Sequence, residues 1–419
     1  MAYTSVTLPY GEKNFRVKIP NNNMLGIIQP QPMMEGKPNE QHLLQQALTH
    51  PIGTPLLRNI VHKGQRIAII TSDITRPCPS AKLLPFIFEE LHTAGVTNQN
   101  IIIILALGLH RSMTAQEIDQ TIPPEIRQGI TILNHNNEEV HYLGTTSRGT
   151  PVEFNKPVVE ADVRICLGNL EFHWFAGYSG GAKAILPGCA SKKTIHSNHA
   201  LMIHPGAHSG QIQGNPLRED LEEAVSKLGI DFILNVLVDR EHHILSAVAG
   251  DFISAHRKGC ETVAKRGKFA LPKKADIVIA SAGGYPKDIN LYQAHKGMEH
   301  ASYFVEDGGI LIFIAECREG MGNQTFESWM LSASTPTEIL ERLQSSFEIG
   351  GHKAAGIARI QKRANIYLVS NFSDPLVQQL FMHPYKEPQS ALDAALDHMG
   401  KTSQILVLPQ AGSTLPNFD

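Results

Sequence analysis

A glycine-rich segment in the middle of the chain holds its densest group of residues able to do chemistry. Residues 171–188 read EFHWFAGYSGGAKAILPG and place His173 and Lys183 around the pair Gly180 and Gly181. Histidine carries protons near neutral pH, and lysine can form a covalent bond to a bound group. Glycines let a ligand approach the backbone closely and leave amide groups for an anion. The segment therefore predicts a small-molecule site.

Three further polar segments each follow an apolar run. They are SDITRP at 72–77, GLHR at 108–111 and GGYPKDINLYQAHKG at 283–297. In the first, the Arg76 guanidinium can take a carboxylate through two hydrogen bonds, or it can form a surface ion pair with Asp73. In the second, His110 is either a general base or a hydrogen-bonded loop histidine.

In the third segment, Lys296 can meet an anion, or it is an exposed lysine near a helix end.

A histidine cluster offers metal ligands, because two of its members are three residues apart and would share one face of a helix. The cluster consists of His196, His199, His204 and His208. The chain lacks H-E-x-x-H, which excludes a zincin, and lacks G-x-x-x-x-G-K-[ST], which excludes a P-loop. We expect at most one or two of these histidines to do chemistry.

Short apolar runs, rich in β-branched residues, must position these segments. They predict strands at 66–70, 101–105, 164–167, 232–238, 276–280, 310–314, 366–369 and 405–408. Nearly uninterrupted runs of this length are typical of parallel strands buried on both faces. Helical patterns separate them: one is capped by Ser80 and ends before Gly95, and another begins at Asn215-Pro216. The alternation indicates an α/β fold with mostly parallel sheets.

The chain has 419 residues, which is too long for one ordinary core. The basic, proline-containing stretch 265–275 predicts a boundary, with an N-terminal α/β domain over 1–268 and a C-terminal α/β domain over 274–419. The polar segments follow strand ends, where ligands bind in doubly wound sheets. We therefore expect the active site in the cleft between the two domains.

Composition excludes several classes of function. A net charge of −3 gives no basic footprint for nucleic acid, and no apolar stretch approaches a membrane span. The N-terminus shows no signal-peptide pattern. Five scattered cysteines, an odd number, argue against a disulfide framework and for a reducing compartment, so we expect a cytoplasmic protein.

Taken together, the motifs resemble those of the LarA family of nickel-pincer lactate racemases and 2-hydroxy acid racemases or epimerases. The resemblance rests on five segments in the same order, spread over most of the chain. They are SDITRP (72–77), GLHR (108–111), EFHWFAGYSGGAKAILPG (171–188), SNH (197–199) and GGYPKDINLYQAHKG (283–297). The third segment is long and specific.

The resemblance implies a cofactor, the nickel-pincer nucleotide, which is a pyridinium-3-thioamide-5-thiocarboxylate mononucleotide carrying nickel. It implies that Lys183 is the covalent tether and His199 the protein ligand of nickel. Gly180 and Gly181 are implied as neighbours of the cofactor phosphate. Separate maturation enzymes are implied as partners, so recombinant protein made without them is expected to lack the cofactor.

The resemblance also implies a small 2-hydroxy acid as substrate and racemisation by reversible hydride transfer. His110 and His173 are implied as the acid and base that serve the two faces of the carbon. Arg76 and Lys296 are implied as ligands of the substrate carboxylate. Asp73 and Gln293 are implied to support the site. Lactate, malate, longer hydroxy acids and sugar acids all stay open as substrates.

Other interpretations of the chain stay open beside this one. A pyridine-nucleotide dehydrogenase would need a G-x-G-x-x-G turn after a strand, and the first βα units have none. A non-catalytic nucleotide-binding scaffold would not need two histidines with two anion-binding residues. A cofactor-independent racemase would instead use two bases to move a proton.

Overall fold

The computed structural model describes residues 2–29, 39–239, 241–271, 273–345, 348 and 350–417. The chain forms two compact units. The first, here called the central unit, is Met33–Lys265. The second, here called the terminal unit, joins Met1–Pro32 to Arg266–Asp419. Among the residues described, no helix has the length and apolar character needed to cross a membrane.

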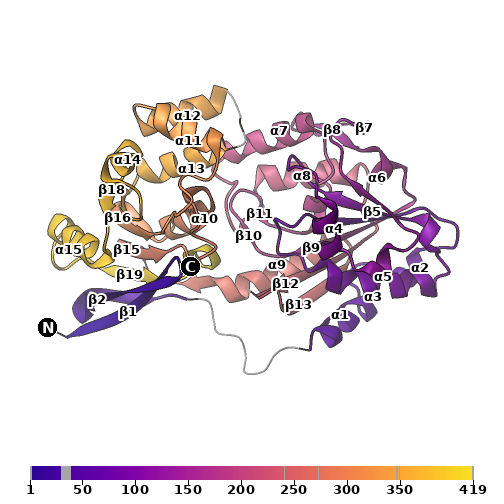
Figure 1. Cartoon of the computed structure of the whole chain (residues 1–419), viewed down its shortest axis with the longest axis horizontal. Coiled ribbons are helices and arrows are strands. Elements are labelled where there is room, and N and C mark those ends of the chain that lie inside the picture. Colours follow the sequence, from indigo (N-terminus) through magenta and orange to yellow (C-terminus); the bar gives the residue numbers. More distant parts are fainter. Residues whose placement is uncertain are drawn as a thin grey trace. The chain divides into compact units, whose positions relative to one another are not determined.

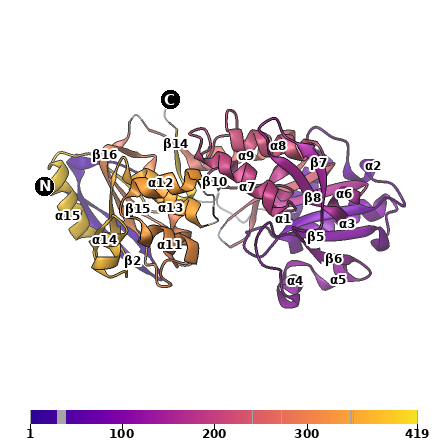
Figure 2. The same cartoon turned by 90° about the horizontal axis from the view of Figure 1, so that it is seen from above.

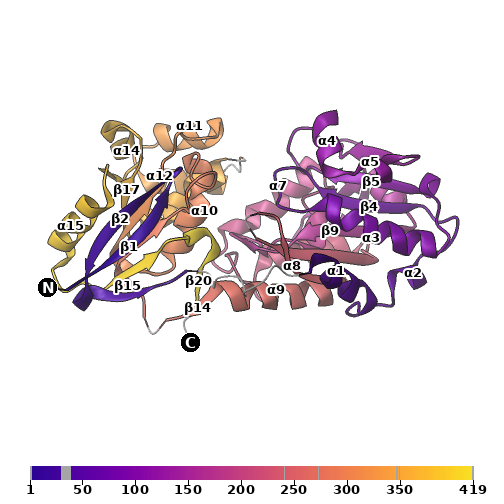
Figure 3. The same cartoon turned by 60° about the horizontal axis from the view of Figure 1, so that its bottom comes forward.

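The central unit is built on a six-stranded sheet in the order β13-β12-β9-β4-β5-β6. Its strands are β4 (Ile67–Ser72), β5 (Ile101–Ala106), β6 (Thr131–Asn134), β9 (Val163–Asn169), β12 (Phe232–Val238) and β13 (Ile244–Gly250). All neighbours pair in parallel except β12 and β13, which are antiparallel. Figure 3 shows β9, β4 and β5 next to one another in this sheet. The carboxyl ends of these three strands therefore share one edge.

Helices that flank this sheet include α1 (Glu40–Thr49), α3 (Ser80–Thr93), α7 (Lys192–Ala200), α8 (Pro216–Ser226) and α9 (Ser254–Gly267). The apolar face of α3 packs into the core, since Leu83, Ile87 and Leu91 are fully buried. Asn215 caps α8 and Pro216 begins it, as predicted. Shorter elements connect these helices and strands. They are α2 (Leu57–Ile60), α4 (Ala115–Thr121), α5 (Pro124–Arg127), α6 (Lys156–Glu160), β7 (Val140–Thr145) and β8 (Pro151–Asn155).

The prediction that Ser80 caps α3 is wrong. Pro79 stands at the cap position and gives no side-chain hydrogen bond, while Ser80 is the first helical residue. The Ser80 hydroxyl instead lies 2.6 Å from the hydroxyl of Thr71, near the end of β4. Because Pro79 fixes its own backbone torsion, the chain enters the helix one residue earlier than the serine signal suggests.

The terminal unit has its own six-stranded sheet, in the order β18-β17-β16-β15-β19-β3, with every pair parallel. Its strands are β3 (Met24–Ile27), β15 (Ala275–Ser281), β16 (Val305–Ile314), β17 (Asn365–Val369), β18 (His383–Tyr385) and β19 (Ile405–Leu408). The helices are α10 (Leu291–Ser302), α11 (Gln324–Ser332), α12 (Pro336–Ser345), α13 (Gly351–Gln361), α14 (Asp374–Gln379) and α15 (Pro388–Met399). Figure 2 shows α13 and α15 on opposite sides of this sheet.

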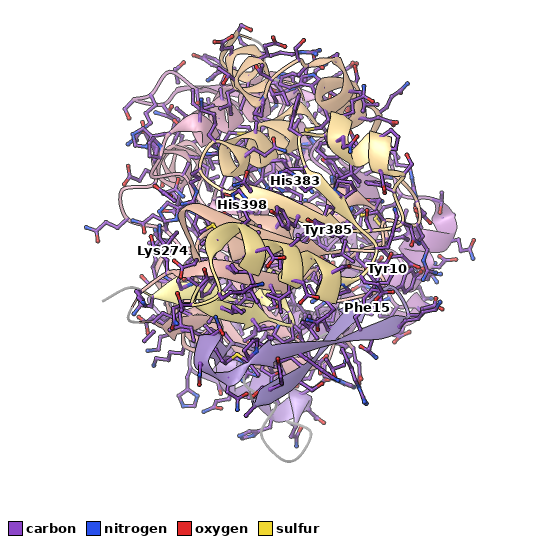
Figure 4. The ribbon with its side chains drawn as sticks, turned by 90° about the vertical axis from the view of Figure 1, so that its left-hand side faces the viewer. Tyr10, Phe15, Lys274, His383, Tyr385 and His398 are labelled. Carbon is purple, nitrogen blue, oxygen red and sulfur yellow. The ribbon has the colours of Figure 1, made fainter. Side chains whose placement is uncertain are left out.

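An N-terminal hairpin belongs to the terminal unit. It consists of β1 (Tyr3–Tyr10) and β2 (Lys13–Pro20), drawn in indigo beside β15 and β19 in Figure 1. Its apolar face packs on the sheet together with α15, and Leu8 and Ile19 are fully buried there. Near the turn, the rings of Tyr10 and Phe15 lie 4.8 Å apart, and both are labelled in Figure 4.

The hairpin and β3 change the expected domain division. A first domain over 1–268 would hold both, yet β3 pairs with β19 as the edge strand of the second sheet. The division after β13 falls at Lys265, at the start of the stretch predicted as a boundary. That stretch is not a plain linker, because α9 ends at Gly267 and β14 (Lys268–Ala270) then pairs with β20 (Leu415–Asn417).

Candidate active site

Three loops of the central unit carry most of the predicted site residues. They follow β4, β5 and β9, which are neighbours in the sheet and run in the same direction. Asp73 and Arg76 follow β4, His110 follows β5, and His173 follows β9. The sheet therefore brings together segments that are far apart in the sequence, at the edge where α/β proteins bind ligands.

Asp73 and His110 form the best-defined contact among these loops. The Nδ1 atom of His110 lies 2.7 Å from Oδ2 of Asp73, and the Thr75 hydroxyl donates to Oδ1 at 2.7 Å. The Asp73 side chain is 4% exposed and the His110 side chain 44% exposed. Burial raises the pKa of Asp73, but the hydrogen bonds from His110 and Thr75 outweigh it and lower the pKa below its ordinary value. The carboxylate therefore stays ionised and orients the imidazole.

Arg76 lies in the same turn, where its amide donates to the Asp73 carbonyl at 3.2 Å. The residue is exposed. Its positive charge contributes to lowering the pKa of both His173 and Lys183, after burial and another neighbouring charge. The surface ion pair considered for Asp73 and Arg76 is not among the ion pairs of the described residues, since His110 takes the carboxylate instead.

The aromatic ring of Phe175 brings three of the predicted residues together. The ring of His173 lies 4.5 Å from it and the ring of His199 lies 4.9 Å from it, both edge-on. The Nζ atom of Lys183 lies 5.5 Å from the same ring centroid. Phe175 itself is buried, so it fixes the places from which these three polar groups project.

His173 ends the short strand β10 (Phe172–His173), which pairs with β11 (Gly177–Tyr178) in a tight hairpin. The amide of Ala176 donates to His173 Nδ1 at 3.3 Å. Burial, together with the charges of Lys183 and Arg76, lowers the pKa of His173 well below its ordinary value. A neutral imidazole whose Nδ1 accepts a hydrogen bond carries its proton on Nε2.

Lys183 sits on the short 3-10 helix Gly181–Ala184, and both Gly180 and Gly181 at the start of this helix have positive φ. A Cβ on Gly180 would lie 2.7 Å from Asn235 Oδ1, and one on Gly181 would lie 2.9 Å from the His256 ring. Only glycine therefore fits this turn. Burial, with the charges of Arg218 and Arg76, lowers the pKa of Lys183 well below the ordinary lysine value. The amine is thus held toward its neutral, nucleophilic form.

His199 lies in the last turn of α7, which Ser191 caps. Of the four clustered histidines, it is the one whose ring contacts Phe175 among the described contacts. His204 and His208 follow α7, where the Nδ1 of His204 accepts the Gly206 amide at 3.0 Å. Among the residues that the structure describes, no three His, Cys, Asp or Glu side chains come together to hold a metal ion.

Gln293 and Lys296 lie in the terminal unit, on the first turns of α10, which Asn290 caps. Gln293 is exposed and Lys296 is partly buried, whereas Ala294 and His295 face the core. Beside them, Lys353 donates to the Tyr292 carbonyl at 2.6 Å and lies over the Tyr292 ring. The start of α10 therefore presents polar side chains on a rigid helix.

The side chain that hydrogen-bonds the backbone of the loop before Lys183 was not predicted from the sequence. Arg218 of α8 is fully buried and donates to the carbonyls of Ala176 and Tyr178. One signal was available: Arg218 stands on the apolar stripe of α8 with Leu221 and Val225, three and seven residues further on. A charged residue in that place needs buried partners.

Comparisons with known proteins agree with this arrangement. Residues 10–210 match the family model of the lactate racemase N-terminal domain, and residues 271–415 match that of the lactate racemase C-terminal domain. A lactate racemase of Thermoanaerobacterium thermosaccharolyticum is 34% identical, over 98% of this chain and 99% of the relative. A lactate racemase of Lactiplantibacillus plantarum is 31% identical, over 97% of this chain and 98% of the relative.

Comparison with solved structures also finds a lactate racemase. The lactate racemase apoprotein of Thermoanaerobacterium thermosaccharolyticum superposes with a TM-score of 0.90, covering 99% of this chain and 100% of that one. A protein from Thermotoga maritima shares the fold at 17% identity, with a TM-score of 0.64. Both family models match in order, and they cover most of the sequence. The chain belongs to the lactate racemase family, a family of isomerases.

Proposed function

We propose that this protein racemises or epimerises a 2-hydroxy acid by reversible hydride transfer, using a nickel-pincer nucleotide tethered to Lys183. The observation that carries the proposal is the convergence of Lys183, His173 and His199 on the Phe175 ring. Lactate is the first substrate to test, because the relatives are named lactate racemases. Malate, longer hydroxy acids and sugar acids are the alternatives.

The chain's own residues fit such a cofactor. A partly buried amine whose pKa is lowered can be joined to a cofactor carboxyl-derived group, and Lys183 is such an amine. Gly180 and Gly181, assigned as neighbours of the cofactor phosphate, shape the turn that carries Lys183; the space beside each is taken by Asn235 or His256, and the Gly181 amide already donates to Asn235 Oδ1 at 2.8 Å. His199 would supply an imidazole to nickel, whose other ligands would come from the cofactor, so the site needs one protein ligand.

When bound, this cofactor supplies a hydride acceptor, which allows a 2-hydroxy acid to pass through the 2-keto acid and back. The protein must then remove and return the proton of the substrate hydroxyl. A base on each side of the carbon would serve the two enantiomers. We assign this task to His110 and His173.

The hydrogen bonds give these two histidines complementary proton arrangements. Asp73 accepts from Nδ1 of His110, which leaves Nε2 of His110 as the acceptor and hence the base. His173 accepts at Nδ1 from the Ala176 amide, which leaves the proton of its neutral ring on Nε2. In this state His110 can act as a base and His173 can donate a hydrogen bond, whereas returning a proton to the substrate would require the protonated, imidazolium form of a histidine.

Cationic side chains would hold the substrate carboxylate. The Arg76 guanidinium is exposed and can bind a carboxylate through two parallel hydrogen bonds. Lys296 of α10 would supply a second charge, with Gln293 three residues before it on the same helix. Asp73 supports the site by fixing His110. Separate maturation enzymes would supply the loaded cofactor.

The test uses the full chain purified from its natural host, so that any cofactor is present. Each lactate enantiomer is incubated separately and the product is resolved by chiral chromatography, while mass spectrometry reads the peptide that contains Lys183. We expect interconversion of the enantiomers, an adduct on Lys183 and one equivalent of nickel. Active enzyme with an unmodified Lys183 would favour a cofactor-independent two-base racemase, and loaded enzyme inactive on every hydroxy acid would favour a nucleotide-binding scaffold.

A further inference from the structure

Buried polar side chains donate hydrogen bonds to the backbone of the loop that leads to Lys183. Three of them donate to its carbonyl groups: Asn215 at the cap of α8, Arg218 of α8, and His256 of α9. Asn215 Nδ2 donates to the carbonyl of Phe175 at 2.9 Å, and Arg218 Nε donates to that of Ala176 at 3.0 Å. Arg218 Nη2 donates to the carbonyl of Tyr178, and His256 Nε2 donates to that of Ser179 at 2.9 Å.

Arg218 has the central place in this arrangement. It bonds two carbonyls on either side of Gly177, whose positive φ and close approach to the Gln211 backbone admit no other residue. Its fork of donors therefore sets the shape of the hairpin that carries His173 and Phe175. The same hairpin leads directly into the Gly180-Gly181 turn and Lys183.

The guanidinium is also a buried charge that acts on the amine of Lys183. Its own partner is Glu222, whose Oε1 lies 3.5 Å from Nη1, but Glu222 is shared with Arg257, which it meets at 2.6 Å. Two guanidinium groups thus face one carboxylate. Burying a charge is costly unless it is well paired, so a fully buried arginine in this position calls for a role beyond packing.

We propose that Arg218 is a positioning residue for Lys183: it fixes the loop backbone and so sets the place and the reactivity of the amine that takes the cofactor. The proposal rests on the tether role proposed for Lys183, but its test reads the chemistry of the amine itself. Arg218 acts through the loop and through its charge, and it does not touch the substrate.

The charge of Arg218 acts on Lys183 in the direction that the proposal needs. After burial, it is the largest influence that lowers the pKa of Lys183, and Glu171 opposes it. It also adds to the lowering of the pKa of His173, after burial and the charges of Lys183, Arg76 and His199. The charged and titratable groups around the amine are Arg76, Glu171, His173, Arg218 and His256. A neutral amine attacks an acyl group, whereas a protonated one does not.

The experiment uses the full chain produced without maturation enzymes and acetylated with the N-hydroxysuccinimide ester of acetic acid. The neutral amine attacks the ester carbonyl, the new N–C bond forms, N-hydroxysuccinimide leaves, and the amine releases a proton to solvent. Peptide mass spectrometry follows the rate at Lys183 across neutral and alkaline pH, with exposed Lys193 of the same chain as internal reference. In the unsubstituted protein we expect Lys183 to reach its half-maximal rate at a lower pH than Lys193.

Two substitutions separate the effect of the Arg218 charge from that of its planar set of hydrogen-bond donors. Arg218→Met removes both, and we expect the Lys183 rate profile to move to higher pH. The rate at neutral pH should then fall by about tenfold for every pH unit that the profile moves. Arg218→Lys keeps a charge but loses the planar fork, so the pH midpoint should stay while the maximal rate falls. Arg164 is the matched control, because it is 13% exposed and binds the carbonyls of Val158 and Ala161 away from the loop.

A purely structural role predicts a different pattern. Arg164→Met should lower thermal stability yet leave the Lys183 profile unchanged, and if Arg218→Met behaves in the same way the proposal is overturned. A Lys183 that reacts no earlier than Lys193 in the unsubstituted protein overturns it as well. If Arg218→Met does not fold, Glu222→Gln provides a second test, because it removes the negative charge that faces Arg218. The Lys183 rate profile should then move to lower pH, and an unchanged profile rejects the proposal. Protein from the natural host with an unmodified Lys183 would reject the tether but leave these rates standing.

Discussion

Asp73 holds Nδ1 of His110 at 2.7 Å, across two loops that follow adjacent strands. The carboxylate is almost fully buried, while the imidazole is nearly half exposed. This pairing fixes which nitrogen of His110 carries the proton and leaves the other nitrogen as the acceptor of the neutral ring, the atom that we propose as the base. The sheet order β9-β4-β5 makes the contact, since it places the end of β4 next to the end of β5.

The first prediction concerns this pair. Asp73→Asn keeps the size of the side chain but removes the ionised acceptor, so His110 loses its fixed proton arrangement. We expect the turnover number to fall by an order of 10²-fold or more, the scale of a lost general base, with nickel content and the adduct on Lys183 unchanged. Rates of lactate racemisation measured together with intact mass check this. An Asp73→Asn enzyme with normal cofactor and normal turnover would show that Asp73 has no catalytic importance.

The second prediction separates the histidines. His199→Ala should lose nickel, because it removes the proposed protein ligand of the metal. His110→Ala and His173→Ala should keep the metal and the adduct but lose of order 10²-fold or more in rate, as expected for a missing acid or base. Metal analysis and initial rates of the three variants are the measurements. Nickel retained at full activity in His199→Ala would show that the ligand assignment is wrong.

The third prediction concerns stability in the absence of the cofactor. Burial lowers the pKa of Lys183 below its ordinary value of 10.5, so between these two values the unfolded chain binds more protons than the folded one. The free energy of unfolding therefore rises with pH across that window. Lys183→Met removes this penalty and should be more stable than the unsubstituted chain at neutral pH, with the difference shrinking as the pH approaches the ordinary lysine value. Urea unfolding at several pH values measures it, and a Lys183→Met chain no more stable at neutral pH would contradict it.

The fourth prediction concerns the substrate carboxylate. Arg76→Lys keeps the charge but loses the planar pair of donors, so KM for the hydroxy acid should rise by roughly tenfold, as for a lost charged hydrogen bond. The exposed Arg111 next to His110 pairs with Glu117 instead, and Arg111→Lys serves as the control. Steady-state kinetics on lactate and on lactamide provide the measurement. Equal turnover of the acid and its uncharged amide would argue against a carboxylate ligand.

The strands were predictable because buried parallel strands leave a simple trace. Runs such as Ile101–Ala106 are β-branched and uninterrupted, and every predicted run is a strand in the structure. The N-terminal segment left no such trace. Its edge strand pairs Met24 with Ile405, and no local pattern announces a partner at that distance along the chain. For the same reason the predicted domain division differs from the observed one at its N-terminal end.

The site was predictable as a set of loops, but not as a set of contacts. The apolar runs placed Asp73, His110 and His173 after three strands, and the strand order then made them neighbours. That Asp73 would pair with His110 and not with Arg76 depends on the packing of two loops. The position of Arg218 behind the Lys183 loop depends on how α8 docks, which the spacing of residues within α8 does not encode.

The fate of the hydrogen at C2 distinguishes hydride transfer from proton transfer. Lactate deuterated at C2 is racemised by the loaded enzyme, and the inverted product is analysed by mass spectrometry, with a parallel reaction of unlabelled lactate in D2O. Hydride transfer keeps this hydrogen on carbon throughout, away from exchangeable groups. We predict that the product retains its label and that the reaction in D2O adds little deuterium at C2. Rapid loss of the label to solvent would contradict hydride transfer and establish a two-base proton-transfer racemase on this scaffold.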